Sequence, residues 1–304
     1  MIVKRVLISG ASGLVGAALS RHLTDAGYIV SKLVRPGAHM HAGDVLWDPN
    51  SATADVPGME GFDAVVNLNG ASIAGTRWTR ARKAELRVSR LGATRLLVDC
   101  LRKVQKKPAV LISASGTGYY GDRGDDILTE ESGPGSDFLA TLARDWEAEA
   151  GRAKTGAGIR TVRLRFGVIF SAAGGALDQM ARPFHMGVGG RLGSGKQWMP
   201  WVAIEDVVRI AQKMIEQEKW RGPVNVVAPT PVRNQEFTQL MAGILKRPAL
   251  LPAPAFALQL LLGEMAKVLL LSSQHVVPKK LIDGGHEFLY PDAETALKKA
   301  LLGG

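Results

Sequence analysis

Three glycines recur at intervals of three residues near the start of the chain, in the segment SGASGLVG. Glycines at such points permit a tight turn, let the backbone approach a pyrophosphate, and let a helix pack closely on a sheet, while the free N–H groups at the helix start receive negative charge. Alone the motif is weak, because its spacing differs from the commonest dinucleotide fingerprint. Its place between a buried strand and a helix nevertheless predicts a nucleotide site. The predicted contacts are Gly10, Ser12, Gly13, Leu14, Val15 and Gly16.

The end of the second predicted strand bears on the choice of cofactor. An acidic residue there would bind the 2′-hydroxyl of the adenine-side ribose, whereas an Arg can pair with a 2′-phosphate. The segment IVSKLVRPG ends in Arg35 with no acidic residue beside it. The sequence therefore predicts NADP rather than NAD, with Ser12 as a second phosphate contact. The alternative is that Arg35 is a solvated strand end.

Short apolar runs alternate with helical patterns along most of the chain. Strands are predicted at 4–10, 29–35, 62–70, 108–116, 158–170 and 223–229, and helices at 13–28, 82–104 and 137–153. This alternation favours an α/β fold with a parallel, doubly wound Rossmann-type sheet. The last 75 or so residues differ, because helical segments there are separated by Pro-rich turns, and they predict a smaller C-terminal domain.

Composition and charge limit the class of protein. Hydrophobic residues make up 46% of the 304 residues, which is ordinary for a globular protein, and the only cysteine, Cys100, falls in an apolar pattern typical of a buried thiol. The apolar stretch at 255–271 is interrupted by Glu264 and Lys267, and the N-terminal segment lacks a signal-peptide pattern. A cytoplasmic protein is expected. The net charge of +10 admits nucleic acid, but the cations are scattered, which favours a solvated basic surface.

At this point the sequence resembles a known family, the extended short-chain dehydrogenase/reductases, in the branch of epimerase-family proteins that carry a small C-terminal domain called DUF1731. The resemblance covers nearly the whole chain, and its blocks include GASGLVG, DAVVNLNGASIAGTRW, SASGTGYYGDRGDDILTEES, DFLATLARDWEAEA and PAPAFALQLLLGEMA. It implies an NADP-binding Rossmann domain at 1–230, whose segment 170–200 contributes to the substrate cleft, and a DUF1731-like domain at 231–304. A monomer or homodimer is expected.

The resemblance also implies further cofactor contacts. Leu68 and Asn69 should line the nucleotide cleft at the carboxyl end of a strand, as the switch-point rule for such sheets also predicts. Glu85 and Arg90 would be polar cofactor contacts on the following helix, unless they belong to a solvated charged face. Backbone around Val168 and Ile169 would lie near the nicotinamide.

The usual proton-transfer pair is missing. In active relatives a Tyr exchanges the hydroxyl proton during hydride transfer, and a Lys four residues later lowers the pKa of that Tyr and holds the ribose. Aligned on DFLATLARDWE, these positions hold Phe138 and Leu142, whose simplest role is core packing. The remaining catalytic candidates are Ser115 at a strand end and the tyrosines Tyr119 and Tyr120, which follow it.

The Gly-rich segment GVGGRLGSGKQWMPW lacks the spacing of a triphosphate loop, but it carries cations and aromatic rings on a backbone able to close over a ligand. The resemblance places the sugar-nucleotide here. The candidate substrate contacts are Arg191, Lys196, Gln197, Trp198 and Trp201. A mobile surface loop is the alternative. Relatives commonly have His where this chain has Ala203, so one polar group near the site is lost.

Two functions therefore remain open. The first is an NADP-dependent oxidoreductase or epimerase acting on a sugar-nucleotide or another small carbonyl or alcohol. The second is a non-catalytic NADP-binding regulatory or scaffold protein, for which the family resemblance suggests an association with cell division. The six histidines show no metal-ligand spacing apart from a loop pair without further ligands, so no metal is predicted.

Overall fold

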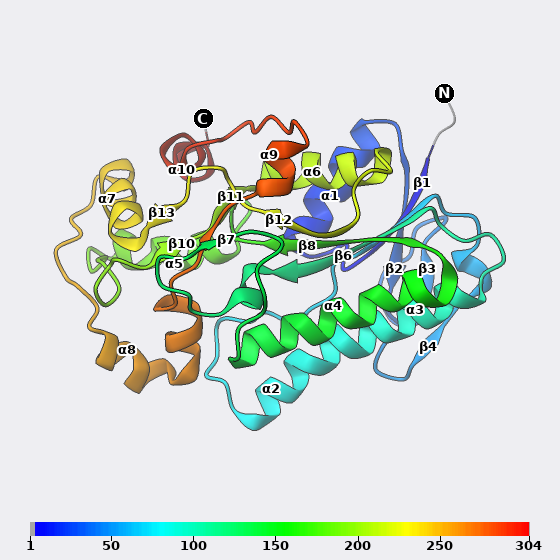
Figure 1. Cartoon of the computed structure of the whole chain (residues 1–304), viewed down its shortest axis with the longest axis horizontal. Helices are drawn as coiled ribbons and strands as arrows, with labels where there is room; N and C mark the ends of the chain where they lie inside the picture. Colours follow the sequence, from blue (N-terminus) through cyan, green and yellow to red (C-terminus); the bar gives the residue numbers. More distant parts are fainter. Residues whose placement is uncertain (1–3, 304) are drawn as a thin grey trace.

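The computed structural model of this chain describes residues 4–303. Residues 1–3 of the first predicted domain and residue 304 of the second lie outside the described residues. An eight-stranded sheet with the order β12-β8-β6-β5-β1-β2-β3-β4 runs through the larger part of the molecule (Figure 1). All neighbours pair in parallel except β3 and β4. The strands are β1 (Arg5–Ser9), β2 (Ile29–Val34), β3 (Val45–Asp48), β4 (Thr53–Ala54), β5 (Ala64–Asn67), β6 (Val110–Gly116), β8 (Arg160–Phe166) and β12 (Gly222–Val226). The predicted Rossmann-type fold is confirmed.

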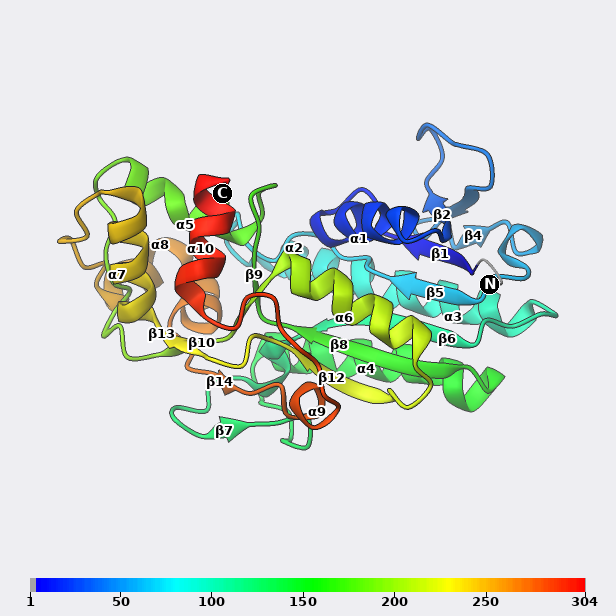
Figure 2. The ribbon, with the colours of Figure 1, turned by 90° about the horizontal axis from the view of Figure 1, so that it is seen from above.

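Helices cover both faces of this sheet. One apolar cluster joins α1 (Leu14–Asp25) and α6 (Ile204–Glu216) to one face, and a second joins α3 (Ala93–Lys103) to the other, where α4 (Phe138–Ala157) lies beside α3 (Figures 1 and 2). Asp137 caps α4 by accepting a hydrogen bond from the Ala140 N–H at 2.9 Å. The strand order reverses at β1, between β5 and β2, so the nucleotide crevice is expected at the carboxyl ends of these strands.

Two long predicted elements are interrupted. The strand predicted at 158–170 divides at Gly167 into β8 and β9 (Val168–Phe170), and β9 pairs with β11 (Trp201–Ala203) outside the main sheet. A Cβ at Gly167 would lie 2.7 Å from the carbonyl oxygen of Pro200, so this close approach of two backbones requires glycine. The helix predicted at 82–104 is α2 (Arg80–Arg87) and α3, joined by a π-helical turn at Val88–Gly92.

The C-terminal part forms its own layer beside the carboxyl ends of the strands (Figure 2). Phe170 stacks on Trp201 with ring centroids 5.0 Å apart, and this pair lies in an apolar cluster shared by β9, β11, α5, α7 and α10. The helices of this part are α5 (Ala176–His185), α7 (Asn234–Leu245), α8 (Ala255–Leu262) and α10 (Ala293–Leu302), whereas α9 (Lys279–Asp283) packs beside β12 of the main sheet. The short strands are β7 (Ile127–Leu128), β10 (Trp198–Met199), β13 (Val232–Arg233) and β14 (His275–Val276). No helix within residues 4–303 has the length and apolar character needed to cross a membrane.

One buried carboxylate attaches the segment before α10 to the Rossmann layer. Asp206, in the first turn of α6, is fully buried and accepts hydrogen bonds from the backbone N–H groups of Leu289 at 2.8 Å and Tyr290 at 3.0 Å. Burial raises the pKa of this carboxyl, and the two N–H donors oppose that rise. The acid therefore satisfies two backbone donors more than 80 residues away in sequence.

We expect Asp206→Ala to lower the free energy of unfolding by about 2 to 4 kcal/mol, because two backbone donors lose their acceptor. Urea unfolding followed by circular dichroism measures this loss. Asp283→Ala removes an exposed carboxylate paired with Lys279 and serves as the control, with an expected loss of about 0.5 kcal/mol. Equal losses in the two variants would show that Asp206 does not anchor the segment.

Candidate functional site

A cavity of about 380 Å³ opens at the carboxyl ends of the central strands. Eight of the predicted cofactor residues line it together, from the turn after β1 and the start of α1, from the residue after β5, and from β9: Gly10, Gly13, Leu14, Val15, Gly16, Leu68, Val168 and Ile169. The remaining lining residues are Gly70, Ala114, Phe166, Gly167 and Ala176. The cavity therefore brings together segments that are separated by more than 150 residues.

The glycines of this cavity are required by close backbone contacts. Gly10 has a φ of +70°, and a Cβ there would lie 2.7 Å from the carbonyl oxygen of Leu68. At Gly16 a Cβ would lie 2.2 Å from the carbonyl oxygen of Gly10 and 2.7 Å from the Cα of Ala11. These contacts hold the start of α1 against β1. No side chain caps this helix end, so its first N–H groups can receive a phosphate.

Polar groups predicted for the cofactor's phosphates lie at the edge of this region. Arg35 follows β2 and is exposed, and Ser12 is exposed in the turn before α1. Neither lines the cavity itself. No three His, Cys, Asp or Glu side chains in the described part of the chain lie close enough to hold a metal ion.

Asn69 faces away from the cavity. Its side-chain amide donates to Ser9 Oγ and to Asn67 Oδ1, both at 2.7 Å. Asn67 in turn donates to Thr94 Oγ1 at 2.8 Å and to Ser113 Oγ at 3.1 Å. The side chain of Asn69 thus belongs to a buried network that joins β1, β5, β6 and α3.

The two charged candidates near α2 differ from each other. Glu85 is exposed and pairs with Arg82, as the alternative interpretation of a solvated face expected. Arg90 is only 6% exposed, yet its guanidinium donates to two backbone carbonyls, of Ala71 at 2.9 Å and Leu86 at 3.4 Å, and pairs with no carboxylate among residues 4–303. Burial and the nearby Arg82 lower the pKa of Arg90 to about 10. This buried cation lies against Gly70, where a Cβ would be 3.1 Å from its Cζ; Gly70 lines the cavity, whereas Arg90 does not.

Two of the three catalytic candidates belong to one buried network. Ser115 Oγ donates to Glu147 Oε1 at 2.8 Å, and Arg165 forms a two-pronged ion pair with Glu147 at 2.7 and 2.9 Å. Arg165 also donates to the Tyr120 hydroxyl at 2.8 Å, which donates to Asn225 Oδ1 at 2.7 Å. Both Ser115 and Tyr120 are buried, and Ala114 rather than Ser115 lines the cavity. In the structure, both hydroxyls therefore have buried hydrogen-bond partners, and neither residue lines the cavity.

The charges of this network are stabilised by one another. Burial by itself would lower the pKa of Arg165, but hydrogen bonds and charge attraction from Glu147 raise it overall. Burial raises the pKa of Tyr120 to about 12 despite the neighbouring Arg165, so this phenol stays protonated at neutral pH.

Tyr119 is placed differently from Tyr120. Its side chain is partly exposed in the 3₁₀ turn after β6, and the guanidinium carbon of Arg165 lies 3.5 Å from its ring centroid. Its hydroxyl forms no hydrogen bond with other described residues. Of the three candidates, only Tyr119 has a hydroxyl without a hydrogen-bond partner among the described residues, and none of the three is among the residues that line the cavity.

Phe138 and Leu142, which the family resemblance is expected to align with the usual Tyr and Lys, pack in an apolar cluster. Phe138 contacts Trp78 edge to face at 5.2 Å, and Leu142 is 2% exposed. Met265 and Val268 from the C-terminal part complete the cluster. This arrangement agrees with the core-packing role expected for the pair.

The Gly-rich segment does not act as one surface. Trp201 is fully buried, stacks on Phe170 and donates its indole N–H to the Thr230 carbonyl at 3.0 Å, so the prediction that it contacts substrate is wrong for this arrangement. Gln197 is buried and donates to the carbonyls of Leu192 and Leu270. Trp198 is partly exposed, stacks on His275 and donates to Asp125. Only Arg191 and Lys196 are exposed cations.

Three residues of this network, Glu147, Arg165 and Asn225, were not predicted from the sequence. A signal was present, because Glu147 falls on the apolar face of α4, between Ala143 and Ala150. A charged residue at a buried helical position calls for a partner. The partner could not be identified from the sequence, because Arg165 lies 18 residues further along the chain, on strand β8.

Two family models match this chain. The model of the NAD dependent epimerase/dehydratase family matches residues 6–227, and that of a domain of unknown function, DUF1731, matches residues 253–300. An epimerase family protein of Mycobacterium bovis is 41% identical over 292 residues, 96% of each chain. Human epimerase family protein SDR39U1 is 34% identical over 303 residues, 97% of this chain and 99% of its own.

Solved structures agree. The crystal structure of human SDR39U1 (isoform 2) with NADPH superimposes with a TM-score of 0.88 at 32% identity, covering 97% of this chain and 98% of the other. A nucleoside-diphosphate sugar epimerase from Corynebacterium glutamicum superimposes with a TM-score of 0.81 at 34% identity, covering 98% of this chain and 58% of the other. MoeE5 in complex with UDP-glucuronic acid and NAD, at 18% identity and a TM-score of 0.68 over 89% of this chain and 93% of its own, shares the fold.

We expect Gly16→Ala to raise the dissociation constant for NADPH roughly tenfold or more, because the new Cβ would displace α1 from β1. Quenching or enhancement of NADPH fluorescence on titration measures the constant. Gly92→Ala is the matched control, since Gly92 has helical backbone angles and its nearest new neighbour, Val88 Cγ1, is 3.8 Å away. Unchanged affinity in a folded Gly16→Ala protein would exclude this loop as the cofactor cradle.

Proposed function

Because the chain belongs to the NAD dependent epimerase/dehydratase family, we propose that it binds NADP at the Gly10–Gly16 cavity and acts as an oxidoreductase or epimerase on a sugar-nucleotide or another small carbonyl or alcohol. The observation that carries the proposal is the convergence of eight predicted cofactor residues on one cavity, with free helix N–H groups at its floor. NADP when bound supplies hydride acceptance and donation.

Arg35 supports the preference for NADP over NAD, and Arg90 supports an anionic cofactor of either kind. Arg35 is an exposed cation at the end of β2, and Arg90 is a buried cation without a carboxylate partner among the described residues. An anion near Arg90 would compensate a charge that is costly to bury alone. The NADPH in the crystal structure of human SDR39U1 agrees with this preference.

Tyr119 is the proton donor and acceptor that we propose for the reaction. It lies in the turn after the carboxyl end of β6, a strand whose Ala114 lines the cavity, and its hydroxyl has no hydrogen-bond partner among residues 4–303, although Tyr119 is not itself a lining residue. Arg165, held by Glu147, fixes the ring from one side. Hydrogen bonding to a substrate oxygen would let this phenol exchange a proton as hydride moves.

We propose that the substrate enters between the domain at 1–230 and the domain at 231–304, beside segment 170–200. The exposed Arg191 and Lys196 could pair with substrate phosphates, and Trp198 offers a partly exposed ring. The sugar-nucleotide class is supported by the Corynebacterium glutamicum relative, which is described as a nucleoside-diphosphate sugar epimerase.

A non-catalytic NADP-binding regulator or scaffold is the second candidate. Two observations favour it. The hydroxyls of Ser115 and Tyr120 donate to buried groups of the protein, and Phe138 and Leu142 are apolar. Such a protein would keep the cofactor cavity and lose turnover.

The first prediction concerns cofactor choice. We expect Arg35→Glu to raise the dissociation constant for NADPH by about 10- to 100-fold and to leave that for NADH nearly unchanged, because only the 2′-phosphate is repelled. Paired fluorescence titrations with the two cofactors measure this ratio. Arg102→Glu, at the end of α3, makes the same charge change on a distant exposed residue and serves as the control. A parallel loss for NADPH and NADH would contradict the role of Arg35.

The second prediction concerns turnover. We expect Tyr119→Phe to lower kcat by about 100-fold or more without changing NADPH affinity, because the transferred proton loses its carrier. Tyr120→Phe should instead lower the melting temperature, since it leaves Asn225 without its phenol donor, and Tyr28→Phe serves as the control. The assays follow NADPH oxidation with a panel of aldehydes and ketones, and NADP⁺ reduction or epimerisation with UDP-glucose and UDP-glucuronic acid.

The outcomes separate the two candidates. Turnover that is unaffected by Tyr119→Phe would remove Tyr119 from the mechanism while leaving the enzyme class intact. Tight NADPH binding with no turnover on any of these compounds would favour the regulatory protein.

A further inference from the structure

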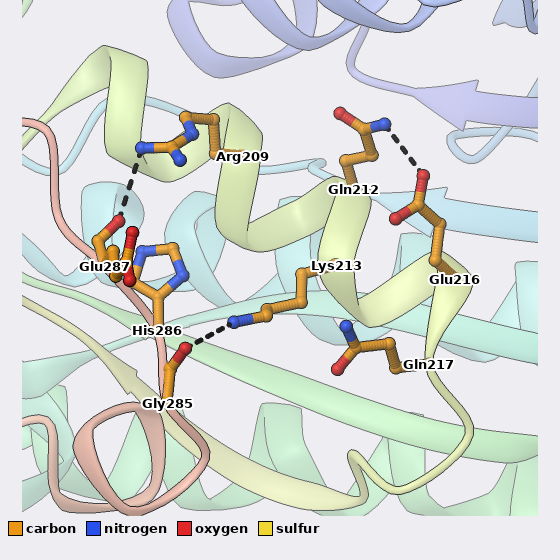
Figure 3. A pocket seen from close by; sticks show the side chains of 8 residues that line it. All are labelled: Arg209, Gln212, Lys213, Glu216, Gln217, Gly285, His286 and Glu287. Atoms are coloured by element: carbon orange, nitrogen blue, oxygen red, sulfur yellow. Dashed lines mark hydrogen bonds between the residues drawn. The ribbon is translucent and has the colours of Figure 1, made fainter.

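A second cavity, of about 270 Å³, lies between α6 and the segment that leads toward α10. Figure 3 shows Arg209 and Lys213 reaching from α6 toward Gly285, His286 and Glu287, with the imidazole of His286 between the two cations. None of its lining residues belongs to the nucleotide cavity. The proposed function therefore makes no use of this cavity.

The cations of this cavity are only weakly partnered. Lys213 Nζ donates to the Gly285 carbonyl at 3.2 Å, and Arg209 Nη1 donates to the Glu287 carbonyl at 3.3 Å, both near the long end of the hydrogen-bond range. The carboxylate nearest to Arg209 is Asp206 at 3.8 Å, and its oxygens already accept the N–H groups of Leu289 and Tyr290. Guanidinium and ammonium donors thus remain for another acceptor.

The two carboxylates at the cavity leave these cations without an ion pair, although the charge of Glu287 partly opposes the lowering of the pKa of Lys213. Glu216 accepts hydrogen bonds from the Tyr28 hydroxyl at 2.7 Å and from Gln212 at 2.8 Å. Glu287 is exposed to solvent, and among the described residues neither acid forms an ion pair with Arg209 or Lys213. Lys219 donates to the Gly284 carbonyl at 3.3 Å, which places a third cation near the cavity.

His286 shows that the site is incomplete. Its Nε2 atom is enclosed and has no hydrogen-bond partner within the described structure. Burial is the main cause that lowers the pKa of this imidazole to about 4, and the positive charges of Lys213 and Arg209 lower it further, so the ring is neutral at physiological pH. Burial and the cations Lys219 and Arg209 likewise lower the pKa of Lys213. An anion would relieve this repulsion between like charges.

We propose that this cavity binds a phosphate group, held by the Arg209 guanidinium and the Lys213 ammonium beside the His286 imidazole. Guanidinium and ammonium groups together are a common phosphate-binding set in proteins, and charge-assisted hydrogen bonds of this kind are the strong ones. The bound group would connect α6 of the Rossmann layer to the segment before α10. Free phosphate and a phosphorylated metabolite share this chemistry.

The test uses the full-length protein saturated with NADPH, so that the cofactor cavity is filled. Inorganic phosphate is titrated against sodium chloride of equal ionic strength while the histidine ring signals are followed by NMR, and His286→Phe identifies the His286 signal among the six histidines. We expect a saturable shift of the His286 signal with phosphate only, together with a rise of the His286 pKa, because a bound anion favours the imidazolium. A His286 signal that does not respond to phosphate in the wild-type protein overturns the proposal.

Two sets of variants locate the binding. Arg209→Gln/Lys213→Gln should weaken phosphate binding roughly tenfold or more, whereas Arg182→Gln/Lys298→Gln, with the same charge change on exposed residues, should not. Gln217→Glu is a gentler variant, because glutamate retains an acceptor for the Trp220 indole while repelling an anion, and Gln105→Glu is its control.

Each result has a consequence. If the double variant does not fold, Gln217→Glu decides, since it removes none of the hydrogen bonds made by the cations. Equal phosphate affinity in Gln217→Glu and Gln105→Glu would overturn the proposal. To separate the sources of phosphate, the titration is repeated with glucose 6-phosphate. A tenfold higher affinity for the ester supports a phosphorylated metabolite, and equal affinities support free phosphate.

Discussion

The buried ion pair between Glu147 and Arg165 is the interaction on which the centre of this molecule depends. Its two hydrogen bonds of 2.7 and 2.9 Å join α4 to β8. Glu147 also accepts a hydrogen bond from Ser115 of β6, and Arg165 also donates to the Tyr120 hydroxyl. Through Tyr120 and Asn225 the same network reaches β12 at the sheet edge. Removing one partner of such a pair leaves a buried charge without compensation, which typically costs about 3 to 5 kcal/mol. The pair therefore holds three strands and one helix in fixed relation.

This network explains why the chemistry expected from the family resemblance cannot simply be transferred to Ser115 and Tyr120 of this chain. A hydroxyl that satisfies a buried ion pair is not available to a substrate, which applies to Ser115 and Tyr120 alike. The apolar cluster around Phe138 and Leu142 has a related effect, because Met265 and Val268 from the C-terminal part fill the space beside α4. The nucleotide cavity uses neighbouring residues of the same strands, Ala114 of β6 and Phe166 of β8, together with the close backbone contacts at Gly10 and Gly16.

The C-terminal part is attached to the Rossmann layer by polar contacts as well as by apolar packing. Phe170 and Trp201 stack within a core shared with α7 and α10, while Asp206 holds the backbone of Leu289 and Tyr290. Arg209 and Lys213 of the same helix reach the carbonyls of the neighbouring residues (Figure 3). Helix α6 therefore links the sheet that carries the nucleotide cavity to the segment that carries α10.

The sequence by itself determined the alternation of strands and helices, the glycine loop, and the residues at strand ends, because these follow from local periodicity and backbone geometry. It predicted eight of the residues that line the nucleotide cavity, and the family resemblance contributed three of them. Only the tertiary structure decided which way Ser115, Tyr120 and Trp201 face. Their partners lie 32, 105 and 29 residues away in the chain, at Glu147, Asn225 and Thr230. Contacts over such separations depend on how strands and helices pack, and no local pattern of residue types encodes that packing.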